Sequence, residues 1–152
     1  MPKPGEPFPE FELLNQDGKP TKLSDYRGRK VIIFAFPKAN TPGCTAQACG
    51  FRDQFPAIEA SNAVVLGLSS DPPEALRAWK DSQGFPYDLL SDPEHKLLDA
   101  WGVWAYQEFG AIKFTGVIRS HWVIAEDGTV LDEQIKVSPT ESVERATSAI
   151  AG

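Results

Sequence analysis

The sequence of 152 residues contains few cysteines, few histidines and no excess of basic residues, and these shortages exclude several classes of protein. Its 15 Lys and Arg against 21 Asp and Glu give a formal net charge of -6, so no positive field exists to collect nucleic-acid phosphates or an anionic membrane surface. The longest uncharged apolar run, residues 31–36, is far shorter than the roughly 18–20 residues that cross a bilayer. We therefore expect no nucleic-acid partner and no membrane span.

The two cysteines, Cys44 and Cys49, lie five positions apart. A chain of this length can build a core without disulfide staples, so the pair is expected to have a chemical role. Zinc is disfavoured because four ligands would also need His95 and His121, and neither lies at finger spacing. Residues 1–7 contain three prolines and no apolar segment, unlike a secretory signal, so we expect a cytoplasmic protein. A transit peptide already removed would leave no trace.

Strand-like and helical patterns alternate along the chain. Apolar runs at 31–36 and 63–68 predict central strands covered on both faces, and helices are predicted over 42–60, 71–84, 92–102 and 139–151. Residues 87–90 predict a short strand, 117–125 and 129–137 an antiparallel pair, and 1–30 an irregular segment with a small hairpin, whereas 103–116 have no clear period. This order predicts an α/β, thioredoxin-like three-layer sandwich with a mixed central sheet and an N-terminal extension, in a single domain over 1–152.

Cys44 lies where open α/β sheets gather their ligand sites, directly after a buried strand. Thr41 is a good N-cap and Pro42 a good first helical residue, which places Cys44 within the first helical turn. Exposed amides and the positive end of the helix dipole favour an anion there, so Cys44 is a candidate thiolate nucleophile. The alternative is that Cys44 is a small buried hydrophobe, as most free cysteines are.

The spacing of the two cysteines has a geometric consequence. Residues five apart in a regular helix have Cα atoms roughly 8–9 Å apart, whereas a disulfide needs them within about 7 Å. If Cys44 and Cys49 join, the helix must therefore unwind. Gly43 and Gly50 bracket the segment and lower its helical stability by roughly 1 kcal/mol each. A reversible disulfide fits this placement better than a permanent one.

The residues around Cys44 resemble the active-site motif of peroxiredoxins, Pro37-x-x-x-Thr41-x-x-Cys44. The string at 41–44 followed by that at 48–53 resembles the bacterioferritin-comigratory, or Q-type, subfamily. The resemblance extends over nearly the whole chain, including residues 5–14, 23–28 and 116–120. The chain is thus similar to a family of thiol-dependent peroxidases.

The resemblance implies a role for each of five residues. Cys44 would be the peroxidatic cysteine, which forms a sulfenic acid, and Cys49 the resolving cysteine, which forms a disulfide with it. Thr41 would orient the peroxide, Arg119 would hold thiolate and peroxide, and Pro37 would shield the site. The implied substrates are hydrogen peroxide and organic hydroperoxides, and the implied partner is a thioredoxin- or glutaredoxin-type reductant. No metal or organic cofactor is needed, and the subfamily favours a monomer.

One position departs from the family pattern, because His121 stands where a threonine is usual, two residues after Arg119. Strand alternation predicts both side chains on one face, so His121 is either near the active site or a packed or solvent-facing histidine. Four aromatic residues could form an apolar collar around the site or belong to the core: Trp101, Trp104, Phe109 and Phe114.

Three alternatives to a peroxidase remain at this point. A thioredoxin-type disulfide oxidoreductase uses Cys-x-x-Cys, and this pair is two residues too far apart. A cysteine hydrolase built on Cys44 and His121 is weaker still. A redox sensor or binding module could use the same disulfide switch without turnover.

Overall fold

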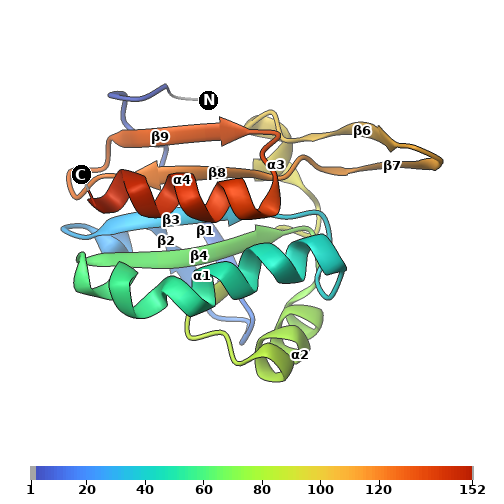
Figure 1. Ribbon diagram of the computed structural model, residues 1–152, viewed down its shortest axis with the longest axis horizontal. Helices are drawn as coiled ribbons and strands as arrows, with labels where there is room; N and C mark the ends of the chain where they lie inside the picture. The colour runs from blue at the N-terminus through green and yellow to red at the C-terminus, as the bar shows by residue number, and fades with distance from the viewer. Residues whose placement is uncertain (1–2, 152) are drawn as a thin grey trace.

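A seven-stranded sheet forms the centre of the computed structural model, which describes residues 3–151 (Figure 1). Its strand order is β2-β1-β5-β4-β3-β8-β9. The strands are β1 (Glu12–Asn15), β2 (Pro20–Lys22), β3 (Lys30–Ala35), β4 (Ala63–Ser69), β5 (Asp88–Ser91), β8 (Ser120–Ile124) and β9 (Val130–Ile135). β3, β4 and β5 run parallel, and the other pairs are antiparallel, so the sheet is mixed as predicted.

Helices cover both faces of this sheet. The helices are α1 (Pro42–Ala60), α2 (Pro73–Gln83), α3 (Lys96–Ala100) and α4 (Pro139–Ala151), with a short 3-10 turn η1 (Leu23–Tyr26). Side chains of α1, α2 and α4 form one core with alternate residues of β3, including Phe34. The other face of β3, including Ile33, packs with α3 and with Phe8 and Phe11 of the N-terminal segment. These layers confirm the predicted three-layer α/β sandwich.

The parallel part of the sheet follows from the local sequence. Parallel neighbours need a crossover, and α1 and α2 supply the two crossovers that link β3, β4 and β5. Every residue of β3 after Lys30 is buried, as expected for a strand covered on both faces. Ligand sites lie beyond the carboxyl ends of such strands, which is where the loop into α1 begins.

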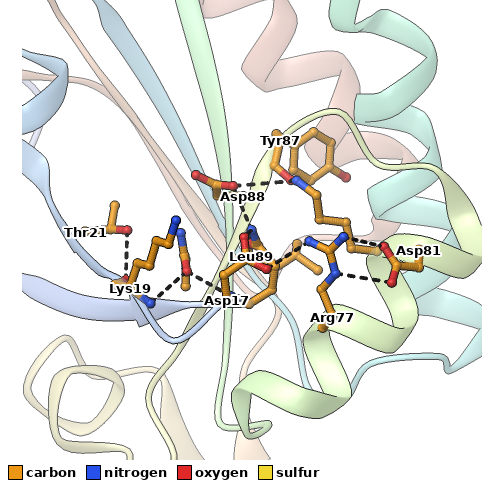
Figure 2. Close-up of polar contacts among 11 residues, drawn as sticks. Asp17, Lys19, Thr21, Arg77, Asp81, Tyr87, Asp88 and Leu89 are labelled. Carbon is orange, nitrogen blue, oxygen red and sulfur yellow. Dashed lines mark hydrogen bonds and ion pairs between the residues drawn. The ribbon is translucent and has the colours of Figure 1, made fainter.

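The N-terminal extension continues the sheet beyond β5 and is tied to α2 by surface charges. Arg77 of α2 pairs with Asp17 in the turn after β1 at 2.9 Å and with Asp81 one helical turn later at 3.0 Å (Figure 2). Lys80 of the same helix pairs with Asp88 of β5 at 3.6 Å. Exposed ion pairs of this kind contribute only about 0–1 kcal/mol each, so the backbone pairing of β1 with β5 and the burial of Phe8 and Phe11 do more to hold the extension.

Residues 103–116, for which the sequence shows no period, form a separate hairpin. β6 (Trp104–Phe109) pairs antiparallel with β7 (Ile112–Val117), and the ribbon extends away from the central sheet (Figure 1). Tyr106 and Ile112 are 59% and 65% exposed, so no buried face imposes an alternating pattern. β7 ends at Val117 and β8 begins at Ser120, so the strand predicted over 117–125 is shorter than expected, whereas its antiparallel pairing with β9 is confirmed.

Two of the predicted helix starts are displaced. α2 begins at Pro73 with Pro72 as its N-cap, so Asp71 is not the capping residue. α3 begins at Lys96 and not directly after Asp92, whose Oδ2 accepts hydrogen bonds from the backbone of Leu97 and Leu98. Among the described residues, no helix is both long enough and apolar enough to span a bilayer.

Candidate active site

The loop between β3 and α1 is held in place by Asp71, at the end of the neighbouring strand β4. The Asp71 carboxylate accepts a hydrogen bond from the Ala39 backbone at 2.8 Å and one from the Ser69 hydroxyl at 2.7 Å. The Ser91 hydroxyl donates to the Asp71 carbonyl at 2.6 Å. Asp71 therefore fixes the loop that carries Pro37 and Thr41, and this explains why its side chain does not cap α2.

Cys44 is fully buried at the third position of α1. Thr41 has the extended backbone of an N-cap, and the first helical hydrogen bond runs from Thr45 N to Thr41 O at 2.8 Å. The Gly43 and Cys44 amides precede that bond and point out of the helix end. The Thr41 side chain does not cap the helix; its hydroxyl donates to the Lys38 carbonyl at 2.8 Å.

Arg119 reaches this helix end from the short connection between β7 and β8. Its Nη2 lies 3.4 Å from Cys44 Sγ, and Nη1 donates to Gln47 Oε1 at 2.7 Å. The absence of a side chain at Gly43 permits this approach, because a Cβ there would lie 3.0 Å from Nη2. The guanidinium charge and the N–H groups of the helix end thus lie beside the Cys44 sulfur.

Gln47 is a site residue that the sequence reasoning missed. It is fully buried and is the acceptor that anchors Arg119. A signal was available, because a residue three positions after Cys44 lies on the same side of the helix. A buried polar side chain at that spacing must have a partner, and Arg119 is one such partner.

Cys49 is half-buried, and both cysteines are free thiols within an unbroken helix. Its Sγ lies 3.6 Å from Gln83 Oε1 at the end of α2. The same turn is held by Arg52 Nη1, which donates to the Gln83 carbonyl at 2.7 Å, and by the Tyr87 hydroxyl, which donates to the Ala48 carbonyl at 2.6 Å. The helix around the two thiols is thus closed and tethered from outside.

A cavity of about 650 Å³ lies against the site, between the β6–β7 hairpin and the start of α4. Pro37, Thr41 and Arg119 line it together with mostly apolar side chains of the surrounding elements, including Ile112, Phe114, Ile118, Val137 and Pro139. The structure thus brings four of the predicted site residues, Cys44, Thr41, Arg119 and Pro37, to one place, and Cys49 follows on the same helix.

Of the two alternatives for the four aromatic residues, core packing is confirmed for Trp101. Among those whose side chains the structure describes, Phe114 alone lines the cavity. Trp101 belongs to the core on the opposite face of the sheet, and Trp104 packs against that core and stacks on His95 at 4.0 Å between ring centroids. The side chain of Phe109 lies outside what the structure describes.

His121 is fully buried under α4, which bears out the packed alternative. Its ring nitrogens bond to Ser142 Oγ and Asp132 Oδ2, both at 2.8 Å. Burial lowers the pKa of His121, and the hydrogen bond to the Asp132 carboxylate opposes this shift without cancelling it. Within residues 3–151 no three His, Cys, Asp or Glu side chains gather as metal ligands.

Comparison with known proteins places this site in a family. The model of the AhpC/TSA family matches residues 4–132. A putative peroxiredoxin of Mycobacterium tuberculosis is 43% identical over 140 residues, covering 92% of this chain and 89% of that protein. Peroxiredoxin Bcp of Escherichia coli is 38% identical over 128 residues, covering 84% and 82%.

Solved structures agree with the sequence relatives. Peroxidoxin BcpB of Mycobacterium tuberculosis matches with a TM-score of 0.87 and 31% identity, over 99% of this chain and 97% of that one. The bacterioferritin comigratory protein of Xanthomonas campestris matches with a TM-score of 0.84 and 26% identity, over 93% and 90%. The fold is therefore the predicted thioredoxin-like one. The chain belongs to the AhpC/TSA family and is a peroxiredoxin of the bacterioferritin-comigratory, or Q, type.

Proposed function

We propose that Cys44 carries out the peroxidase reaction as its attacking thiolate. The observation that carries this assignment is the 3.4 Å contact between Arg119 Nη2 and the buried Cys44 Sγ at the start of α1. Ionisation alone is a small gain, because a free thiol is already roughly 3% ionised at pH 7, so full ionisation adds only about 30-fold to its rate. The guanidinium and the helix amides supply the rest by stabilising charge that develops on the departing oxygen.

Thr41 and Pro37 position and shield the substrate in this proposal. The Thr41 hydroxyl donates its proton to the Lys38 carbonyl, so its oxygen can accept a hydrogen bond from the peroxide O–H. Pro37 forms part of the cavity wall beside Thr41. The peroxide then lies between an acceptor on one side and Arg119 on the other, with the sulfur ahead of it.

The chemical step balances without a cofactor. The thiolate sulfur donates an electron pair to the terminal oxygen of ROOH, the S–O bond forms and the O–O bond breaks. The leaving RO⁻ takes a proton and departs as ROH, while Cys44 is oxidised to a sulfenic acid. The two electrons come from the sulfur.

Cys49 resolves the sulfenic acid. Its thiolate attacks the Cys44 sulfur, the S–S bond forms, the S–O bond breaks and the departing hydroxide takes a proton to leave as water. Because α1 is intact in the dithiol form, this step requires the segment around both cysteines to unwind. The contacts of Arg52 and Tyr87 described above must break or lengthen as it does so.

A thioredoxin- or glutaredoxin-type dithiol then reduces the disulfide by exchange and is itself oxidised. The chain is expected to act as a monomer and a single domain, since both thiols lie in one helix and both cores share one sheet. The size and apolar wall of the cavity favour organic hydroperoxides as well as hydrogen peroxide. The Xanthomonas campestris relative is described for its alkyl peroxide reduction activity.

A coupled assay tests the proposed function. The protein is mixed with thioredoxin, thioredoxin reductase, NADPH and either hydrogen peroxide or cumene hydroperoxide, and oxidation of NADPH is followed. We expect sustained consumption that depends on both peroxide and protein, and none with Cys44→Ser. Formation of a disulfide without sustained consumption, with glutaredoxin and glutathione also failing, would identify a redox sensor instead.

A further inference from the structure

A line of buried hydrogen bonds continues from Arg119 away from the cavity. Gln47, which accepts from Arg119, donates from Nε2 to Ser142 Oγ of α4 at 2.9 Å. Ser142 Oγ lies 2.8 Å from His121 Nδ1, and His121 Nε2 lies 2.8 Å from Asp132 Oδ2 of β9. Gln47, Ser142 and His121 are all fully buried. Four elements, α1, α4, β8 and β9, thus contribute to one polar line inside an otherwise apolar layer.

Only one arrangement of protons satisfies every group in this line. Arg119 has donors alone, so the oxygen of the Gln47 amide must face it and the NH₂ group must face Ser142. The Ser142 oxygen accepts that bond, which leaves its own proton for His121 Nδ1. The imidazole is then neutral with its proton on Nε2, and it donates to the Asp132 carboxylate.

Every bond therefore runs in the same direction, from a guanidinium at one end to a carboxylate at the other. The neutral state of the imidazole agrees with its lowered pKa, because burial, helped by Arg145 of α4, disfavours a second proton more than Asp132 favours it. Arg119 and Asp132 are held apart by three neutral groups, so the line fixes orientations more than it pairs charges. A buried network with all partners satisfied is rigid, and one broken link leaves polar groups unpaired.

We propose that His121, with Ser142 and Asp132, is a positioning residue for the peroxidase reaction. It holds the Gln47 amide in the orientation that accepts from Arg119, and so keeps Nη2 against the Cys44 sulfur. This inference rests on the proposed role of Cys44. His121 does not act as an acid or base on the sulfur, since a guanidinium and a primary amide lie between them and neither exchanges a proton readily at neutral pH.

The position of each nitrogen of His121 supplies a matched pair of variants. In His121→Asn the side-chain amide reaches the place of Nδ1 and can still accept from Ser142, but it no longer reaches Asp132. In His121→Gln the amide reaches the place of Nε2 and can still donate to Asp132, but Ser142 loses its acceptor. Both variants lose the ring, so a purely structural role predicts similar losses in the two.

The first readout is the rate of Cys44 oxidation by peroxide under single-turnover conditions, with urea unfolding as the measure of stability. We expect His121→Gln to slow oxidation roughly tenfold, the effect of weakening one charged hydrogen bond, and His121→Asn to remain within about threefold of the unchanged protein. Ser142→Ala removes little volume and cuts the same link, so it should behave as His121→Gln. Ser142→Ala still tests the proposal if the histidine variants fail to fold.

The second readout is the NMR signal of the Arg119 guanidinium, which does not depend on peroxide. Separate Nη resonances report a guanidinium whose rotation is hindered by its hydrogen bonds. We expect separate Nη resonances in the unchanged protein and in His121→Asn. In His121→Gln and Ser142→Ala we expect these resonances to merge. Unchanged Nη signals and oxidation rates in both of the latter variants would overturn the proposal. If the unchanged protein fails to oxidise at Cys44, the proposed function fails, and the NMR comparison still decides the positioning claim.

Discussion

At the scale of single residues, the proposed chemistry depends on how closely the Arg119 guanidinium approaches the Cys44 sulfur. Arg119 Nη2 lies 3.4 Å from Cys44 Sγ, and the approach passes directly over Gly43. A Cβ at Gly43 would lie 3.0 Å from Nη2 and 3.7 Å from Cζ, closer than ordinary van der Waals contact at the first atom. Glycine is thus needed here for space, although it weakens the helix start.

Gly43→Ala should therefore separate activity from stability. The added methyl group displaces the guanidinium, and weakening its bond to the sulfur by about 1.4 kcal/mol slows peroxide reduction roughly tenfold. Alanine favours a helix over glycine, so the free energy of unfolding should not fall. Single-turnover oxidation and urea unfolding measure the two effects, with Thr45→Ala as a control in the same turn. A Gly43→Ala protein with full peroxide activity would show that the Arg119 contact is dispensable.

The sequence predicts the residues with a local signal and misses those that act through space. Cys44 and Thr41 are recognised because an N-cap, a proline and a strand end surround them. Arg119 was assigned only through the resemblance to peroxiredoxins, because an isolated arginine near a strand carries no signal. Ser142 and Asp132 could not be found, since their roles depend on how α4 and β9 pack against β8.

At the scale of elements, the proposed mechanism requires α1 to be rigid before oxidation and open after it. Its first turn holds Cys44 in place, while the turn carrying Cys49 is tethered by the Tyr87 hydroxyl on the Ala48 carbonyl at 2.6 Å. Tyr87 also stacks on Phe85, with ring centroids 5.5 Å apart, so its ring is held independently of its hydroxyl. Removing the hydroxyl should therefore loosen α1 and leave the Tyr87 ring in place.

Tyr87→Phe should make the opening of α1 easier. Losing one buried hydrogen bond costs the closed helix about 1 kcal/mol, so disulfide formation after oxidation should accelerate severalfold. Quenched-flow trapping of the free thiols measures that rate, and amide exchange over residues 42–55 should rise in parallel. Tyr26→Phe, a change outside α1, is the control. An unchanged rate of disulfide formation would mean that the tether of Tyr87 does not limit the opening.

The β6–β7 hairpin is the element that sequence reasoning could least predict. Its residues do not alternate between core and solvent, because the ribbon projects from the sheet and contributes one wall of the cavity. The antiparallel pair β8–β9 was predicted because its turn at 126–128 is a recognisable hairpin signal and its β8 residues are all buried. The hydrophobic pattern of the sequence therefore predicts the central sheet and its helices well and the β6–β7 hairpin poorly.

At the scale of the whole molecule, the buried imidazole of His121 links stability to pH. Burial lowers its pKa in the folded state, whereas in the unfolded chain it titrates near the ordinary histidine value of about 6.5. Below that value the unfolded chain binds a proton that the folded protein resists. Stability should consequently be full above that pH and decline as the pH falls through it.

The free energy of unfolding should fall between pH 7.5 and pH 5.5, and it should fall less in His121→Asn than in the unchanged protein. Urea unfolding at several pH values measures it in both proteins. The difference between the two curves isolates His121 from the carboxylates, which titrate at lower pH. Parallel curves over this range would show that the proton on His121 is not linked to folding.

The proposed reaction depends on Cys44 as the thiolate that attacks peroxide and on Cys49 as the thiol that resolves the product. The most direct measurement is tandem mass spectrometry after one equivalent of hydrogen peroxide, in the presence of dimedone, which traps sulfenic acids. We expect a Cys44–Cys49 disulfide in the unchanged protein, a dimedone adduct on Cys44 in Cys49→Ser, and no rapid reaction in Cys44→Ser. A dimedone adduct on Cys49 in Cys44→Ser, formed at the rate of the unchanged protein, would contradict it.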